Sequence, residues 1–289
     1  MIITGKKSRL LMQKILLPTD FSENARNAIS YALKLFADSD CIFYFLHVLP
    51  PTLGERRTVP TSVTNEMLGE AEAKTREQLK TLISEVTSGN EKTEILVKFD
   101  LFTDAVAHIA EDKNIDVVVM GSHGAGGVRE FFIGSSTSNL IGHIQCPILA
   151  IPKDLEFEPV NEIGFATDYS FVYSRKGLEP IFRIAEKFSS HIRFYHVEEG
   201  RDEWNDEKEK IRKEIKKACE GYDASFYLLT DAPLSTATRL FVESREIDLL
   251  CMAAEKRNFM DNLLGKSPVK DMSYHATTPL LVLHKNTLK

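Results

Sequence analysis

The feature that constrains this sequence most is an internal repeat. The segment "KILLPTDFSENARNAISYALKLFADSDCIFYFLHV" from Lys14 resembles "EIGFATDYSFVYSRKGLEPIFRIAEKFSSHIRFYHV" from Glu162. Farther along, "AEDKNIDVVVMGS" is matched by "VESREIDLLCMAA", and "CPILAIP" is matched by "TPLLVLH", in the same order. Because a long-period repeat indicates copies of one structural unit, the sequence predicts two related domains, residues 13–152 and 161–285, joined by the charged segment Pro152–Asn161.

Within each copy, strand-like runs alternate with helical periods. Ile42–Val48 and Val117–Met120 are continuously apolar, as is typical of strands covered on both faces of a sheet. Between such runs, apolar residues recur at helical spacing, as do Leu79, Leu82, Ile83 and Val86. The pattern predicts an α/β fold with two tandem copies of an open five-stranded parallel sheet flanked by helices. The segment Pro50–Glu66, rich in Pro, Thr and charge, is predicted to be a long loop.

Composition narrows the class of protein and its location. At 289 residues the chain is long enough for two domains. Its net charge of −6 argues against nucleic acid or an anionic membrane as the main partner, because both need a basic surface. No run of 18 apolar residues and no signal-peptide pattern is present, so we expect a cytoplasmic protein. The four cysteines lack the spacing of a metal site, and we expect them to pack as small apolar side chains.

A glycine-rich stretch, "GSHGAGGVREFFIGSS" at Gly121–Ser136, follows the strand-like run "DVVVM". Glycines let backbone N–H groups converge on an anion, and a helix that begins near Gly134 would direct its N–H groups at the same phosphates. In open α/β sheets, ligands bind beyond the carboxyl ends of strands, where the strand order reverses. Asp20 follows the first strand and would face this stretch if the order reverses between the first and fourth strands. Two simpler interpretations remain open: the stretch is a flexible connector, and Asp20 with Ser22 only caps a helix.

The spacing of this stretch is Gly, two residues, Gly, nine residues, Gly-Ser, in a domain that opens with "ILLPTDFSENA" and contains "FLHV". It resembles the ATP-binding branch of the universal stress protein (UspA-like) family, and the repeat makes the chain look like a tandem member. The resemblance implies a Rossmann-like, adenine nucleotide alpha hydrolase-like fold with a switch between strands one and four. It also implies that ATP is the ligand, and the sequence leaves open whether Mg²⁺ accompanies it. The positions that match the family's ATP contacts are Gly121, Gly124, Gly134, Ser135 and Ser136 for the ribose and phosphates, and Asp20 and Val48 for the adenine.

The second copy departs from this pattern. It keeps Asp168 and Val197, but Ala253, Ala254, Glu255 and Lys256 stand where the first copy enters its glycine stretch. Side chains there would crowd the backbone approach, and Glu255 would repel phosphate. We therefore expect the second copy to bind ATP poorly or not at all.

The resemblance and the residues together predict a regulatory, ATP-binding stress-response protein. No nucleophile or general base stands beside the glycine stretch, so we expect no enzyme, no catalytic or metal residues, and at most slow ATP hydrolysis. His47 and His196 recur at matching places and are interpreted as structural. The alternatives are a slow ATP hydrolase or nucleotidyl-transfer enzyme, and a nucleotide-free interaction scaffold.

Assembly is also predicted from the repeat. The two domains are expected to pair within the chain as a pseudo-dimer, through the strands at "PILAIP" and "PLLVLH", because unpaired sheet edges tend to be covered. The second domain would then serve this pairing or bind a protein partner. The sequence leaves open which protein that is, which stress is involved, and whether two chains form a homodimer.

Overall fold

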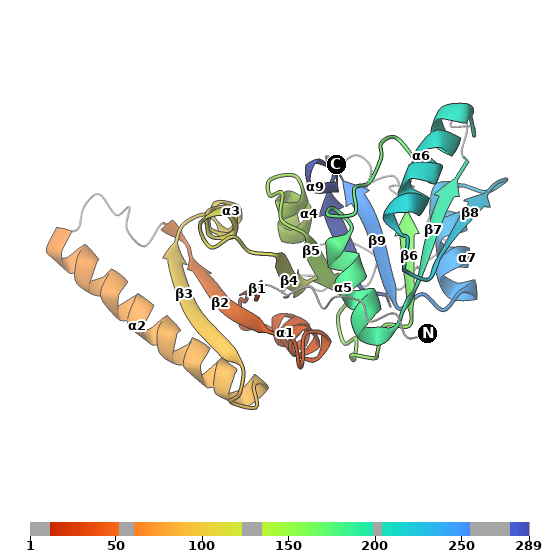
Figure 1. Cartoon of the computed structure of the whole chain (residues 1–289). Helices are drawn as coiled ribbons and strands as arrows, with labels where there is room; N and C mark the ends of the chain where they lie inside the picture. Colours follow the sequence, from red (N-terminus) through yellow and green to blue (C-terminus); the bar gives the residue numbers. More distant parts are fainter. Residues whose placement is uncertain (1–11, 52–60, 123–134, 199–203, 255–277, 289) are drawn as a thin grey trace.

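The computed structural model describes residues 12–51, 61–122, 135–198, 204–254 and 278–288. These residues form one ten-stranded sheet with helices on both faces (Figure 1). The strand order is β3-β2-β1-β4-β5-β10-β9-β6-β7-β8. The strands are β1 (Gln13–Pro18), β2 (Cys41–Leu49), β3 (Lys92–Phe99), β4 (Val117–Gly121), β5 (Ile148–Ile151), β6 (Glu162–Ala166), β7 (His191–Val197), β8 (Ala224–Leu229), β9 (Leu249–Ala254) and β10 (Leu280–His284).

The sheet consists of two parallel sections joined in the middle. β1 to β5 have the order 3-2-1-4-5. Read from the opposite edge of the sheet, β6 to β10 have the equivalent order, 8-7-6-9-10. The strands inside each section are parallel, whereas β5 and β10 are antiparallel, with Leu149 opposite Leu281. The predicted parallel α/β fold and the predicted pairing of "PILAIP" with "PLLVLH" are both confirmed, and the two sections form one continuous sheet.

Helices cover the two faces of the sheet in matching fashion. Alternate residues of a strand point to opposite faces, so Ile15 and Leu17 join one core and Leu16 joins the other. The first core is covered by α1 (Glu23–Leu35), α2 (Thr61–Val86), α5 (Glu179–Phe188) and α6 (Asp206–Ala218). The second core is covered by α3 (Phe102–Asp112), α4 (Ser135–Ile141) and α7 (Leu234–Ser244); the short α9 (Lys285–Leu288) follows β10.

One predicted boundary is wrong. The segment Pro50–Glu66 was expected to be a loop throughout, but α2 begins at Thr61, so residues 61–66 are helical. A nucleated helix gains one hydrogen bond for each added residue, so it can extend through residues of weak helix propensity. Residues 52–60 of the predicted loop lie outside the described residues.

The described part of the chain contains no helix long and apolar enough to cross a membrane. Cys41, Cys219 and Cys251 are buried, as expected for small apolar side chains, and Cys146 is half-buried. Across the same residues, no group of three or more His, Cys, Asp or Glu side chains is arranged to hold a metal ion.

Candidate functional site

The strand order reverses at β1, and this places three predicted site residues together. β1 pairs with β2 on one side and with β4 on the other, as the family resemblance implied. Asp20 lies two residues after β1, Val48 is the next-to-last residue of β2, and Gly121 is the last residue of β4. All three therefore lie at the carboxyl ends of adjacent parallel strands, which is where open α/β sheets bind ligands.

The loop after β1 has a specific local structure. Phe21 has a left-handed backbone (φ 64°), which is uncommon for a bulky residue. Its N–H donates to Thr19 Oγ1 at 3.0 Å, and Ser22 N–H donates to Asp20 Oδ1 at 3.0 Å. Ser22 is the N-cap of α1, since its Oγ accepts from Ala25 N at 3.2 Å. Capping thus explains Ser22, and a contact within the loop explains one oxygen of Asp20, while Asp20 remains exposed to solvent.

Gly121 has a packing role that the sequence did not reveal. A Cβ at this position would lie 2.3 Å from Nδ2 of Asn24, a residue in the first turn of α1 that is only 7% exposed. Any side chain at position 121 would therefore collide with Asn24. From the other face of the sheet, the hydroxyl of the buried Thr137 in α4 donates a hydrogen bond from Oγ1 to Gly121 O at 3.3 Å. Asn24 and Thr137 were missed because polar residues near helix starts are too common to single them out.

The remaining predicted residues are described in part. Ser136 is exposed in the first turn of α4. Ser135 begins this helix, but its side chain lies outside the described part, and Gly124 and Gly134 lie entirely outside it. The same holds for Glu255 and Lys256 of the second copy, whereas Ala253 and Ala254 end β9.

The two repeated histidines make the same structural contact. His47 Nδ1 lies 2.7 Å from Thr19 O, and His196 Nδ1 lies 2.9 Å from Thr167 O. A carbonyl oxygen can only accept, so Nδ1 carries the proton in both rings. Each histidine thus fixes the start of the loop that follows β1 or β6, in agreement with the structural interpretation.

The second section carries the corresponding loop in a covered form. Tyr169 and His196 are 1% and 2% exposed. The Trp204 ring contacts Tyr169 edge-on at 5.2 Å between centroids, and Lys208 Nζ lies 3.0 Å from His196 Nε2. Their counterparts Phe21 and His47 are only half-buried.

A mostly parallel sheet, helices on both faces and a reversal of strand order beside β1 together define a Rossmann-like α/β protein. The model of the universal stress protein family matches residues 12–152. This part of the chain is a domain of that family.

Known proteins agree with this assignment. Universal stress protein MJ0577 of Methanocaldococcus jannaschii is 25% identical over 159 residues, which cover 50% of this chain and 97% of the relative. Universal stress protein Sll1388 of Synechocystis is 28% identical over 148 residues, 48% of this chain and 96% of the relative. These relatives thus match about half of this chain.

Two solved structures match nearly the whole chain and support the fold. A universal stress protein from Archaeoglobus fulgidus superposes with a TM-score of 0.68 at 18% identity, over 94% of this chain and 98% of that chain. A functionally unknown protein, PA1789 from Pseudomonas aeruginosa, superposes with a TM-score of 0.53 at 11% identity, over 96% of this chain and 94% of that chain.

Proposed function

We propose that residues 13–152 bind ATP and that residues 161–285 are a second, related domain that does not. The observation that carries this proposal is the position of β1 between β2 and β4, which gathers Asp20, Val48 and Gly121 at one end of the sheet. These are the residues that the motif resemblance assigns to adenine and phosphate contact. The helix α4 starts at Ser135, at the end of the glycine stretch, and would direct its first N–H groups at the phosphates.

We propose binding rather than efficient turnover. The titratable side chains beside this site contact main-chain groups: His47 of β2 donates Nδ1–H to Thr19 O, and Asp20 accepts from Ser22 N. Neither of these two contacts is with a hydroxyl or thiol that the side chain could activate as a nucleophile. ATP would accordingly act as a regulatory ligand, with at most slow hydrolysis, in a cytoplasmic stress response read by a protein partner.

The second domain would stabilise the first as a pseudo-dimer inside one chain. β10 covers the edge of β5 with an antiparallel pairing. In addition, Lys187 of α5 donates from Nζ to Leu35 O at 2.8 Å and to Ala37 O, at the end of α1. Figure 1 shows α1 and α5 side by side on the same face of the sheet.

Isothermal titration of the whole chain with ATP, with and without Mg²⁺, tests the proposal. We expect the unmutated protein to bind and Gly124→Glu to lose binding, because a carboxylate replaces a backbone approach to phosphate. Gly127→Glu is the matched control: it adds the same charge in the same stretch but lies outside the family spacing, and it should retain binding. Absence of binding by the unmutated protein would instead favour a nucleotide-free scaffold.

A further inference from the structure

A second cluster of polar side chains lies at the opposite ends of the strands, on β6, β7 and β8. His191 begins β7, Ser225 is the second residue of β8, and Asp223 directly precedes β8. His191 Nδ1 lies 2.8 Å from Asp223 Oδ2, and His191 Nε2 lies 2.7 Å from Ser225 Oγ. A carboxylate only accepts, so the proton of the neutral ring is on Nδ1 and Nε2 is left as an acceptor. The single hydroxyl proton of Ser225 has two acceptors within reach, Nε2 of His191 at 2.7 Å and the Tyr227 hydroxyl at 3.2 Å, and attack on a substrate uses the first. This is the geometry in which an imidazole activates a serine nucleophile.

The side chains around Ser225 hold it in place. In the structure Ser225 Oγ–H donates to the hydroxyl of Tyr227 at 3.2 Å, and that hydroxyl also accepts from Arg193 Nη1 at 2.7 Å. Arg193 is itself fixed by two bonds to the Glu162 carboxylate, at 2.6 and 2.8 Å. The hydrogen bond with Ser225 and the charge of Arg193 lower the pKa of Tyr227. Arg245 adds a further positive charge, with its Cζ 5.3 Å from the centre of the Tyr227 ring.

The position of Ser225 on the last strand of the sheet also provides a hydrogen-bond donor for a developing oxyanion. Within the described chain, β8 is an outer strand. Asp223 O and Leu229 O accept from Ile192 N and Glu198 N, so the odd-numbered residues of β8 direct their main-chain groups at β7. Because this direction alternates along a strand, the N–H of Phe226 points to the outer edge. The N–H of the residue after a serine nucleophile is a common oxyanion donor.

This cluster is not a requirement of the repeated fold. Lys14 and Glu162 are equivalent in the repeat, and they lie opposite Ile42 and His191 on the neighbouring strands. Two residues after Ile42 and His191 are Tyr44 of β2 and Arg193 of β7. On the next strand, Glu94 of β3 lies opposite Tyr44, and Ser225 of β8 lies opposite Arg193. The first section therefore has Ile and Glu at the positions of the histidine and the serine.

We propose that Ser225, His191 and Asp223 form an acyl-transfer site that hydrolyses small carboxylic esters. Asp223 is 76% exposed and His191 is 23% exposed at the side chain, so a small substrate in solution can reach them. The positive charge of Arg245 favours an ester that carries an anionic group. The proposal goes beyond ATP binding and does not depend on it, and it departs from the expectation that the chain is not an enzyme.

The chemistry needs only the ester and water. Ser225 Oγ bonds to the carbonyl carbon while its proton passes to His191 Nε2. The ester C–O bond breaks, and the leaving alcohol takes the proton from Nε2. Water then attacks the acyl-serine and gives a proton to Nε2; the bond between the acyl carbon and Ser225 Oγ breaks, and Ser225 recovers the proton as the acid leaves.

The test uses the whole chain with a fluorophosphonate reagent and with p-nitrophenyl acetate. We expect peptide mass spectrometry to find the adduct on Ser225, formed with loss of fluoride, and Ser225→Ala to abolish it. His191→Gln should slow labelling by about 100-fold or more, the usual contribution of a general base. Asp223→Asn, which changes an exposed residue, should give an intermediate rate.

Ser244→Ala is the matched control, since Ser244 is also accessible but donates to a carbonyl, Phe241 O. It should leave the rate unchanged, as should added ATP. The proposal is overturned if Ser225 is not modified, or if His191→Gln, shown to be folded by circular dichroism, is labelled as fast as the unmutated protein. Either result would identify the cluster as a set of cross-strand contacts that only stabilises the sheet edge.

Discussion

The loops after β1 and β6 have the same local structure but different surroundings. In both, a threonine hydroxyl accepts from the N–H of an aromatic residue with positive φ, Phe21 at 64° and Tyr169 at 50°. In both, a histidine Nδ1 binds the carbonyl of that threonine. Since one copy keeps this geometry without the glycine stretch, the geometry belongs to the fold, and the openness of the loop is what distinguishes the proposed ATP site.

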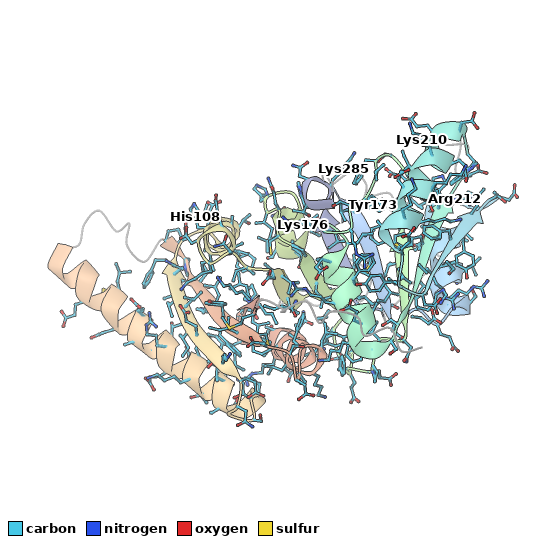
Figure 2. The ribbon with its side chains drawn as sticks, in the orientation of Figure 1. His108, Tyr173, Lys176, Lys210, Arg212 and Lys285 are labelled. Carbon is cyan, nitrogen blue, oxygen red and sulfur yellow. The ribbon has the colours of Figure 1, made fainter. Side chains whose placement is uncertain are left out.

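The second loop is closed by side chains from later in the chain. Trp204 lies against Tyr169, and Arg212, labelled in Figure 2, lies over the Trp204 ring with its Cζ 5.2 Å from the centroid. Lys208 Nζ meets His196 Nε2, the atom that is left to accept once Nδ1 binds Thr167 O. Tyr169 and His196 are therefore covered by these side chains, whereas Phe21 and His47 of the first loop are only half-buried.

The helix after the second loop also starts late. α1 begins at Glu23, four residues after Thr19, but α5 begins at Glu179, twelve residues after the equivalent Thr167. The C-terminal end of the chain packs where the missing turns would be: Ser174 N donates to Leu288 O at 2.6 Å. A Cβ at Gly177 would lie 2.4 Å from Leu288 Cα.

The same region contains Tyr173, whose hydroxyl lies 2.7 Å from Thr167 Oγ1. Lys285 lies with its Nζ 4.8 Å from the Phe171 ring centroid, and Figure 2 labels Tyr173 and Lys285 in this part of the second section. In the second copy the residue equivalent to Asn24 is Val172. Because the helix starts late, Val172 precedes it and is 42% exposed, whereas Asn24 is buried. The second copy can therefore carry Ala253 where the first needs Gly121.

The largest predicted effect comes from opening the covered loop. Trp204→Ala removes the ring that covers Tyr169, and we expect the free energy of unfolding to fall by about 3 kcal/mol, as for a large aromatic side chain. ATP affinity should not change, because Trp204 belongs to the second section. Urea unfolding followed by circular dichroism gives the first quantity, and Val172→Ala at an exposed site is the control with little expected effect. A loss of ATP binding in Trp204→Ala would contradict the separation of the two sections.

The next effect concerns the close contact of Gly121 with Asn24. Gly121→Ala should cost about 2 kcal/mol of stability, typical of overpacking, and should weaken ATP binding. Gly142→Ala is the matched control, since a Cβ there meets only Asn139 O at an ordinary 3.8 Å. The double variant Gly121→Ala/Asn24→Ala should regain stability relative to Gly121→Ala. If it does not, steric conflict with Asn24 is not the reason for glycine at this position.

A smaller effect is expected at the contact between the sections. Lys187→Met retains the aliphatic part of the side chain but removes the ammonium that binds Leu35 O and Ala37 O. We expect a loss of about 1.5 kcal/mol, the lower value for a charged hydrogen bond. Thermal unfolding measures it, and Lys176→Met, at an exposed lysine of the same section, should be neutral. An equal effect of both variants would argue against a specific contact.

The sequence predicted the elements whose signal is local. Continuous apolar runs located the strands, and Asp20 and the glycine stretch each followed one of these runs. The reversal of strand order that brings them together, and the assignment of Val48, came only from the family resemblance. The late start of α5 was not predicted, because its cause is the packing of Leu288, more than 100 residues away in the sequence. The contact of His191 with Ser225 was missed for a similar reason: it depends on the register of β7 and β8, which no single segment specifies.

Equilibrium dialysis of the whole chain against ATP measures how many sites the two sections provide. One ATP per chain in the unmutated protein, and none in Gly124→Glu, is the predicted result. Two ATP per chain would show that the covered loop of the second section also binds. None would show that the open loop after β1 does not bind ATP.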